Sequence, residues 1–251
     1  MRISVGDLRY YRDSMQSIGQ LASEHVRESV QSLGDGAGVT AMREAAIAAI
    51  TESVGIHGEM AQALAARLFD EVCAAEGVGS PTFELYDDII DYGMLEEKVR
   101  WAAQYLADRD GGERFMDECS VLAEMYAWRC NRDSTIRNCE RNGLRYARVP
   151  TNSNPCEWCV MLASRGFVYS SADNAEAGSH EHCKCVVVPG GPSTTIEGYD
   201  PDGYYDMWGG MVNARAYERA KRNGTSMEVE RAGIMRRYGE AAKRAKARHK
   251  R

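Results

Sequence analysis

Six residues near the middle of the chain have the types and spacing of metal ligands. The segment 154–159 reads Asn-Pro-Cys-Glu-Trp-Cys, and the segment 180–185 reads His-Glu-His-Cys-Lys-Cys. A Cys-x-x-Cys pair lets two thiolates face one metal ion from a tight turn, and a second pair of ligands about twenty residues later completes a structural zinc site. The sequence therefore predicts zinc, with the following ligands: Cys156, Cys159, His180 and Cys185, with Cys183 or His182 as alternatives.

The ligand set stays open because the two segments supply more candidates than a tetrahedral site has places. Cys183 and Cys185 would lie on the same face of a strand, so their spacing does not separate them. Reduced thiols that only pack, with the histidines hydrogen-bonded nearby, are the alternative to a metal site. A redox role for the Cys-x-x-Cys pair is disfavoured because no β-α-β pattern flanks it.

Two enzymatic interpretations of the same residues are weaker. Pro155, Cys156 and Cys159 match one half of the zinc-deaminase signature, and His57-Gly58-Glu59 matches its His-x-Glu half. The two halves lie about a hundred residues apart, which is far more than one helix and strand would need. An HNH-type nuclease could use His182 as its base on a zinc scaffold, but the sequence offers no clear acidic partner for it.

Arginines recur with helical spacing just before the cysteine pair. The sequence predicts a long helix from Glu113 to about Tyr146, and four arginines recur near its end at spacings of four, four and three. Such a stripe suits a phosphate or carboxylate partner, because a guanidinium pairs with these anions through two hydrogen bonds. A solvated helix face is the alternative. The stripe consists of Arg137, Arg141, Arg145 and Arg148.

The remaining cysteines are scattered through sequence with helical character. The first 30 residues lack the apolar stretch of a signal peptide, so no export is expected and the thiols are expected to be reduced rather than paired as disulfides. We expect Cys73, Cys119, Cys130 and Cys139 to be buried as small apolar side chains.

Hydrophobic spacing and proline placement indicate a mainly α fold. Prolines crowd the stretch from Pro150 to Pro201, so helices are expected on both sides and irregular structure between. We expect a helix break near Gly55, helical structure over 85–102, a short strand at 186–188, and a final helix that starts at Met211 and breaks at 223–224. The expected divisions are an N-terminal helical region (1–112), a long helix with a small Cys/His-rich α+β knuckle (113–192), and a loop with a basic C-terminal helical tail (193–251).

The charge is distributed unevenly. Residues 1–100 carry 17 acidic and 8 basic side chains, whereas residues 201–251 carry 6 acidic and 13 basic ones. A basic tail on an acidic body predicts an anionic partner for the tail, either DNA or an acidic protein surface. The candidate contacts in the tail are Arg236, Arg237, Lys243, Arg244, Lys246 and Arg248. No apolar run approaches the roughly 18 residues of a membrane span, so no membrane partner is expected.

The order of these motifs resembles a known viral family. Arg148-Val149-Pro150, then Cys156-x-x-Cys159, the segment 161–169 and His180-x-x-Cys183-x-Cys185, resemble the Mu F-type (head morphogenesis) domain of tailed-phage minor head proteins, in the form found in phages of actinobacteria. The resemblance covers about residues 130–190, and it does not decide whether metal is bound.

The resemblance implies a protein present in few copies inside the capsid, near the portal. Such a protein assists head assembly and DNA packaging or ejection, and it is not an enzyme. Its partners would be the portal protein and capsid or scaffold proteins, with packaged DNA contacted by the basic tail. It would reside in the host cytoplasm during assembly and in the virion afterwards. The alternatives are a zinc-dependent nucleic-acid enzyme, either a nuclease or a deaminase, and a DNA-binding accessory protein that stays outside the virion.

Overall fold

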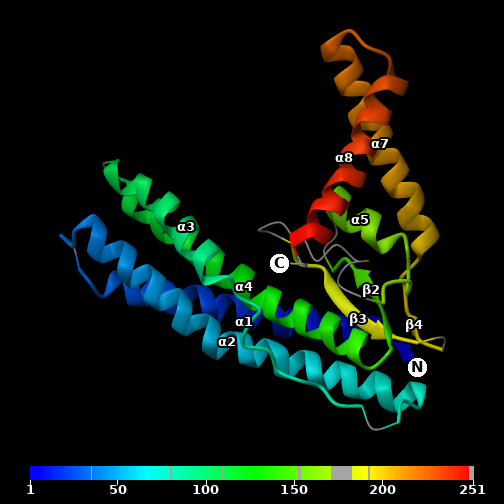
Figure 1. Cartoon of the computed structure of the whole chain (residues 1–251), viewed down its shortest axis with the longest axis horizontal. Helices are drawn as coiled ribbons and strands as arrows, with labels where there is room; N and C mark the ends of the chain where they lie inside the picture. The colour runs from blue at the N-terminus through cyan, green and yellow to red at the C-terminus, as the bar shows by residue number, and fades with distance from the viewer. Residues whose placement is uncertain are drawn as a thin grey trace. The chain divides into compact units, whose positions relative to one another are not determined.

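The computed structural model describes residues 1–34, 36–79, 81–108, 110–151, 154–170, 183–191 and 193–248, with side chains to residue 240. Over these ranges the chain is mainly helical, as the sequence predicts (Figure 1). The helices are α1 (Val5–Gln31), α2 (Val39–Glu76), α3 (Tyr92–Ala102), the short 3-10 helix η1 (Ala103–Ala107), α4 (Gly111–Arg141), α5 (Glu157–Ala163), α7 (Pro201–Asn223) and α8 (Met227–Arg248). The strands are β1 (Arg2–Ile3), β2 (Arg145–Val149), β3 (Val186–Gly190) and β4 (Thr195–Ile196). None of the described helices is long and apolar enough to cross a membrane.

The chain divides into two compact units that are each built from separate stretches of sequence. The helical unit comprises residues 9–68 and 83–135, and the knuckle unit comprises residues 1–8, 69–82 and 136–251. The helices α1, α2 and α4 contribute residues to both units. The predicted division of the chain into 1–112, 113–192 and 193–251 uses consecutive stretches of sequence. It is a different kind of division from these two units, and it stays a prediction.

In the helical unit, α1 packs one apolar face against its neighbours. The buried side chains recur every three or four residues, as the helical period requires. A polar contact also ties three helices together: the Asn131 amide group accepts a hydrogen bond from the Tyr11 hydroxyl at 2.9 Å and donates one to the Ala61 carbonyl at 2.8 Å. The buried face of α1 consists of Tyr11, Met15, Ile18, Gly19, Ala22, Val26 and Val30.

The predicted helix break near Gly55 is wrong, because α2 runs without interruption from Val39 to Glu76. Helix packing explains the difference. At Gly58, α2 approaches α4 so closely that an added Cβ atom would lie 2.9 Å from the Sγ atom of Cys130. Glycine weakens an isolated helix, but here it permits close packing that outweighs its intrinsic cost.

The predicted helix over 85–102 begins later in the structure, since α3 starts at Tyr92. The Gln62 side chain holds the preceding segment in a non-helical form: it accepts from the Tyr86 N–H at 2.8 Å and donates to the Tyr86 carbonyl at 3.0 Å. These bonds satisfy backbone groups that a helix would otherwise pair. Asp91 then caps α3 by accepting from the Met94 N–H at 3.0 Å.

In the knuckle unit, α4 ends at Arg141, earlier than predicted. Gly143 adopts a left-handed conformation with φ of 67°, and the Leu144 N–H donates to the Cys139 carbonyl at 2.9 Å, which closes the helix. The chain continues directly as β2, which pairs antiparallel with β3. The predicted strand at 186–188 is confirmed as part of β3.

The helices α7 and α8 form a hairpin whose chain reversal lies at the predicted position. Gly224 has φ of 65° and ends α7, and α8 follows at Met227. The start of α7 at Pro201 rather than Met211 corrects the prediction. Asp200 caps the helix and Pro201 fits its first position, where no N–H is needed.

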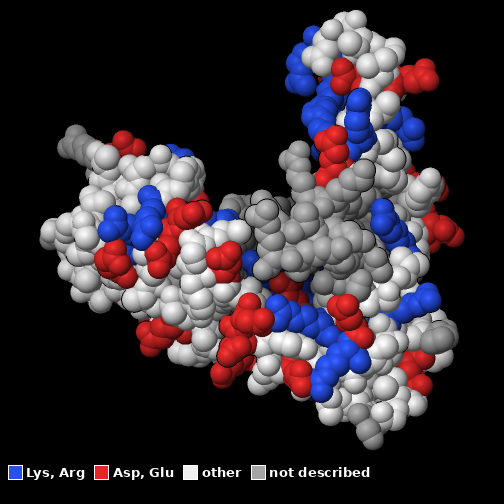
Figure 2. Space-filling view, in the orientation of Figure 1, with Lys and Arg blue, Asp and Glu red and all other residues white. Residues whose placement is uncertain are grey.

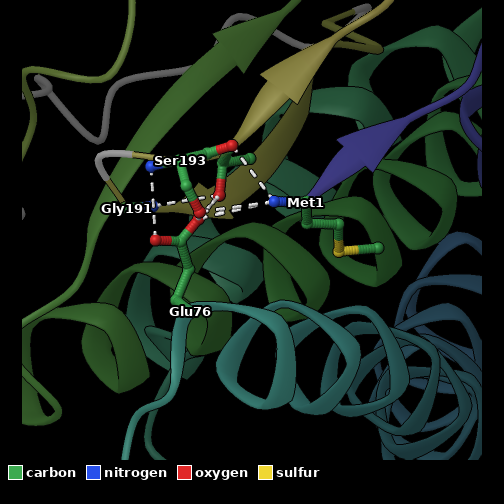
Figure 3. A network of polar contacts seen from close by, with 5 residues as sticks. Met1, Glu76, Gly191 and Ser193 are labelled. Carbon is green, nitrogen blue, oxygen red and sulfur yellow. Dashed lines mark hydrogen bonds and ion pairs between the residues drawn. The ribbon is translucent and has the colours of Figure 1, made fainter.

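A buried carboxylate fastens the segment after β3 to the end of α2 (Figure 3). Glu76 accepts hydrogen bonds from the Ser193 hydroxyl at 2.8 Å and the Thr194 hydroxyl at 2.5 Å. The ammonium group of Met1 lies 3.8 Å from the same carboxylate, and the Gly191 N–H donates to the Thr194 hydroxyl at 3.1 Å. Next to this network, β1 and β4 pair in parallel.

Candidate metal centre

Three cysteines of the knuckle unit bring their sulfur atoms together. Cys159 lies on α5, and Cys183 and Cys185 lie in the short run that leads into β3. Thr151 fixes this run by donating a hydrogen bond from its hydroxyl to the Lys184 carbonyl at 2.8 Å. The three Sγ atoms lie within 4.8 Å of one another, and all three residues are buried. We refer to Cys159, Cys183 and Cys185 as the sulfur cluster.

The distances within the sulfur cluster suit a shared metal ion. The Cys183 Sγ atom lies 3.5 Å from the Sγ atoms of both Cys159 and Cys185. Cys159 and Cys185 have their Cα atoms 6.7 Å apart and their sulfurs in contact, so they could also form a disulfide. A disulfide uses two sulfurs and leaves the third as a thiol beside them. A metal ion would use all three, since sulfurs bound to one zinc at about 2.3 Å lie about 3.8 Å apart.

Cys156 borders the sulfur cluster without joining it. It packs against the cluster, and its Sγ atom accepts a hydrogen bond from the Cys159 N–H at 3.3 Å. Burial raises the pKa of its thiol, while the backbone hydrogen bond from Cys159 acts in the opposite direction. Cys156 also lines a pocket whose other walls include the three cluster cysteines, Met211 and Arg215. Its position makes it a candidate fourth ligand.

The structure distributes the predicted ligands differently from the preferred set. Cys183, an alternative in the sequence analysis, contributes to the cluster on equal terms with Cys159 and Cys185. Cys156 lies beside the cluster, as described above. His180 and His182 lie outside the described residues, so the ligand set with its histidine stays a prediction.

The predicted arginine stripe is not a helical face. Arg137 and Arg141 lie on α4, but Arg145 and Arg148 lie on β2, where the side-chain period is two. Arg145 is exposed, whereas Arg148 is fully buried, and its Nη2 atom donates to the Cys183 Sγ atom at 3.8 Å. The glycine turn at Gly143 is the physical reason for the change of period. Arg148 therefore lies in the interior beside the sulfur cluster, and its side chain is not at the surface.

The α7–α8 hairpin is attached beside the cysteines through side chains that the ligand pattern does not predict. Glu157 forms an ion pair with Arg215 at 2.6 Å and contacts the Tyr238 hydroxyl. Trp158 stacks on Tyr238 with ring centroids 5.8 Å apart. These contacts connect α5 to both α7 and α8. The sign of this attachment in the sequence is the pair of large side chains, Glu157 and Trp158, between the two cysteines of Cys-Glu-Trp-Cys. Neither belongs to the predicted ligand set.

The basic tail is described only in part. Arg236 and Arg237 are exposed on α8. Figure 2 shows Lys and Arg side chains on the α7–α8 hairpin with Asp and Glu among them. The side chains of Lys243, Arg244, Lys246 and Arg248 lie outside the described residues, so their role stays a prediction.

The histidine of the deaminase interpretation has a different environment. His57 lies on α2 in the helical unit and is buried. Its Nδ1 atom is 2.9 Å from the Ser53 carbonyl oxygen, and its ring packs edge-on against His25. Among the described residues, the group with metal-ligand geometry consists of the three cysteines and does not include His57.

Comparison with known proteins identifies the family. The VG15 protein family matches residues 2–211, which is most of the chain. The chain belongs to the VG15 protein family. It is therefore a viral protein. No curated protein and no solved structure matches the chain.

The VG15 match includes residues of both units and the whole sulfur cluster. It ends within α7, so α8 and the basic tail lie beyond it. The part of the chain that carries the family resemblance thus includes the candidate metal centre.

Proposed function

We propose that this VG15 family protein is a minor head protein of a tailed phage. It acts inside the capsid near the portal, where it assists head assembly and DNA packaging or ejection. The proposal rests on two lines of support: membership of a viral family over residues 2–211, and the resemblance of residues 130–190 to the Mu F-type domain. Its partners are the portal protein, capsid or scaffold proteins, and packaged DNA.

One observation carries most of this proposal. Three of the four cysteines that carry the resemblance, Cys159, Cys183 and Cys185, bring their sulfurs together in the buried cluster, and the fourth, Cys156, packs against it. These cysteines are spread over about thirty residues of sequence, yet they lie at one place in the structure. Such an arrangement is typical of a site that holds a domain together. This supports the view that the resemblance reflects a shared domain and not a chance run of cysteines.

The sulfur cluster acts in this proposal as a structural zinc site. Zinc bound by Cys159, Cys183, Cys185 and a fourth ligand fastens α5 to the start of β3. Structural zinc sites are closed by protein ligands, and buried cysteines fit this type better than an open catalytic site. The proposed role is accordingly architectural and not enzymatic.

Quantitative mass spectrometry of purified virions tests the proposed location. We expect peptides of this chain in particles that contain packaged DNA, in few copies relative to the major capsid protein. A polymerase or another replication protein of the same virus serves as the control and should be depleted from the particles. If the chain is abundant in infected cells but depleted from virions to the same extent as the control, the head-protein proposal is wrong.

A further inference from the structure

The charged side chain of Arg148 lies directly against the sulfur cluster. Arg148 is fully buried on β2, and its Nη2 atom donates to the Cys183 sulfur at 3.8 Å. Its Nε and Nη1 atoms have no hydrogen-bond partner within the described ranges. Among the described residues, the Cys183 sulfur is therefore the hydrogen-bond acceptor for the Arg148 guanidinium group.

A buried guanidinium needs a negative charge nearby. Arginine stays protonated in proteins, so Arg148 carries its positive charge in every state of the site. An uncompensated charge in the interior is strongly destabilising. Three neutral thiols carry no charge, and a disulfide with one thiol carries none either. Neither form of the cluster compensates Arg148.

A thiolate-bound zinc ion supplies negative charge beside the guanidinium group. Zn²⁺ with three thiolates and one neutral histidine has a net charge of −1, and with four thiolates it has a net charge of −2. Zn²⁺ with two thiolates and two histidines is neutral and would leave Arg148 uncompensated. The charge of Arg148 therefore distinguishes between ligand sets that the residue spacing leaves open.

We infer that Arg148 is the buried counter-ion of a thiolate-rich zinc centre with at least three cysteine ligands. The inference rests on the proposed zinc site and adds the charge of that site and the residue that balances it. Arg148 does not bind the metal. It favours the metal-bound form, because a metal–thiolate group carries negative charge, whereas three thiols or a disulfide with one thiol carry none. Partners in the surroundings of metal ligands typically change metal affinity by about 10- to 100-fold.

Zinc affinity of full-length variants tests this role. The variants are Arg148→Met, which keeps a long side chain without charge, and Arg148→Lys, which keeps the charge. Arg145→Met is the matched control, because Arg145 is exposed on the same strand. Zn²⁺ affinity is measured by competition with a chelator, and Co²⁺ replaces Zn²⁺ so that the sulfur-to-cobalt absorption reports the number of thiolates.

We expect Arg148→Met to weaken Zn²⁺ binding about 10- to 100-fold. Arg148→Lys should retain most of the affinity, and Arg145→Met should match the wild type. The metal-free Arg148→Met protein should be at least as stable as the metal-free wild type, since an uncompensated buried charge has been removed. The wild-type cobalt spectrum should indicate three or four thiolates.

Other outcomes overturn the inference. Unchanged affinity in Arg148→Met, or an equal loss in Arg148→Lys, shows that charge is not the property that matters. An Arg148→Met protein that fails to fold without metal, under conditions where the wild type folds, assigns Arg148 a packing role instead. A wild-type chain that binds no Zn²⁺ refutes the proposed zinc site itself, and this result is distinct from a failure confined to Arg148.

Discussion

Cysteine occurs in two different surroundings in this protein. Four buried cysteines lie within α2 and α4, where desolvation raises the pKa of their thiols, to about 11 for Cys73 and to about 12 for Cys119 and Cys130. These residues fit the predicted role of small apolar side chains, and their burial is confirmed. The sulfur cluster differs because its three side chains face one another.

Replacing one cluster cysteine should remove the metal. We expect Cys183→Ser to lose stoichiometric zinc, because a hydroxyl is a poor substitute for a thiolate ligand. The free energy of unfolding should fall, since zinc binding contributes about 10 kcal/mol to the folding of zinc-finger peptides. Metal analysis and thermal unfolding of the purified chain measure both effects.

Cys119→Ala is the control for this experiment, because it removes a buried thiol of the helical unit without touching the cluster. It should destabilise the protein but keep one zinc per chain. A Cys183→Ser protein that retains full zinc content would contradict the assigned ligands.

The Glu76 carboxylate predicts a pH-dependent contribution to stability. Hydrogen bonds from the Thr194 and Ser193 side chains hold the pKa of Glu76 below its ordinary value of 4.5. The folded state therefore favours the ionised carboxylate. Its contribution to stability is complete above pH 4.5 and is lost as the pH falls through the lower pKa that Glu76 has in the folded protein. Glu76→Gln should cost about 1–2 kcal/mol near neutral pH, and the difference from wild type should shrink in acid.

Urea unfolding at a series of pH values checks this prediction. The exposed Glu240 provides the matched variant, Glu240→Gln, which should follow the wild type at every pH. An effect of Glu76→Gln that is constant or larger in acid would show that the ionised carboxylate is not the source of the stabilisation.

At the scale of elements, the sequence predicts the helices better than their ends. The mainly α fold, the strand at 186–188 and the break at 223–224 follow from local spacing and glycine or proline placement. The errors arise where contacts distant in sequence decide the backbone. Gln62 holds the segment at Tyr86 in a non-helical form, and α2 stays continuous where it packs closely against α4 at Gly58.

In the candidate site, too, local sequence predicts some features, and contacts between residues distant in sequence decide the others. Residue types and spacing identify the cysteines as possible ligands, but they leave Cys183 as an alternative to Cys185. The structure brings both sulfurs to Cys159, which depends on how α5 lies beside the run before β3. The arginine spacing predicts that Arg148 lies on a helix. The prediction is wrong because a single residue, Gly143, ends the helix before Arg148, and the spacing of the arginines does not show this. The run Tyr146-Ala147-Arg148-Val149, apolar apart from the arginine, was the available sign that this arginine is buried.

Two glycines of α2 provide a test of helix packing with an internal control. Gly58→Ala should destabilise the protein by about 1–3 kcal/mol, because the new methyl group meets the Cys130 side chain. Gly55→Ala should be neutral or stabilise by up to about 1 kcal/mol, since no atom lies within 4 Å of the added carbon and alanine favours the helix. Chemical unfolding of the two variants measures both. Equal effects of the two substitutions would show that close packing is not the reason for Gly58.

At the scale of the whole molecule, the distribution of charge suggests separate partners for the two ends of the chain. Residues 1–100 are strongly acidic and residues 201–251 are strongly basic. In the proposed function the acidic part suits a protein partner and the basic tail suits packaged DNA, which it contacts through phosphates without reading bases.

Removal of residues 241–251 should weaken binding to duplex DNA of any sequence. The removed segment contains six basic residues, and the salt slope of log K should fall by about 0.9 for each phosphate that the shortened chain no longer neutralises. Fluorescence anisotropy at several salt concentrations measures the slope, and a truncated chain with an unchanged slope would exclude the tail as the DNA-binding element.

Native mass spectrometry of the chain co-expressed with the portal protein of the same virus tests the central claim most directly. We predict a portal complex that carries this chain at a fixed stoichiometry. The released chain should carry the added mass of one zinc ion rather than the loss of two hydrogens that a disulfide would cause. A chain that stays free in the presence of assembled portal, with or without zinc, would contradict the proposed role in the phage head.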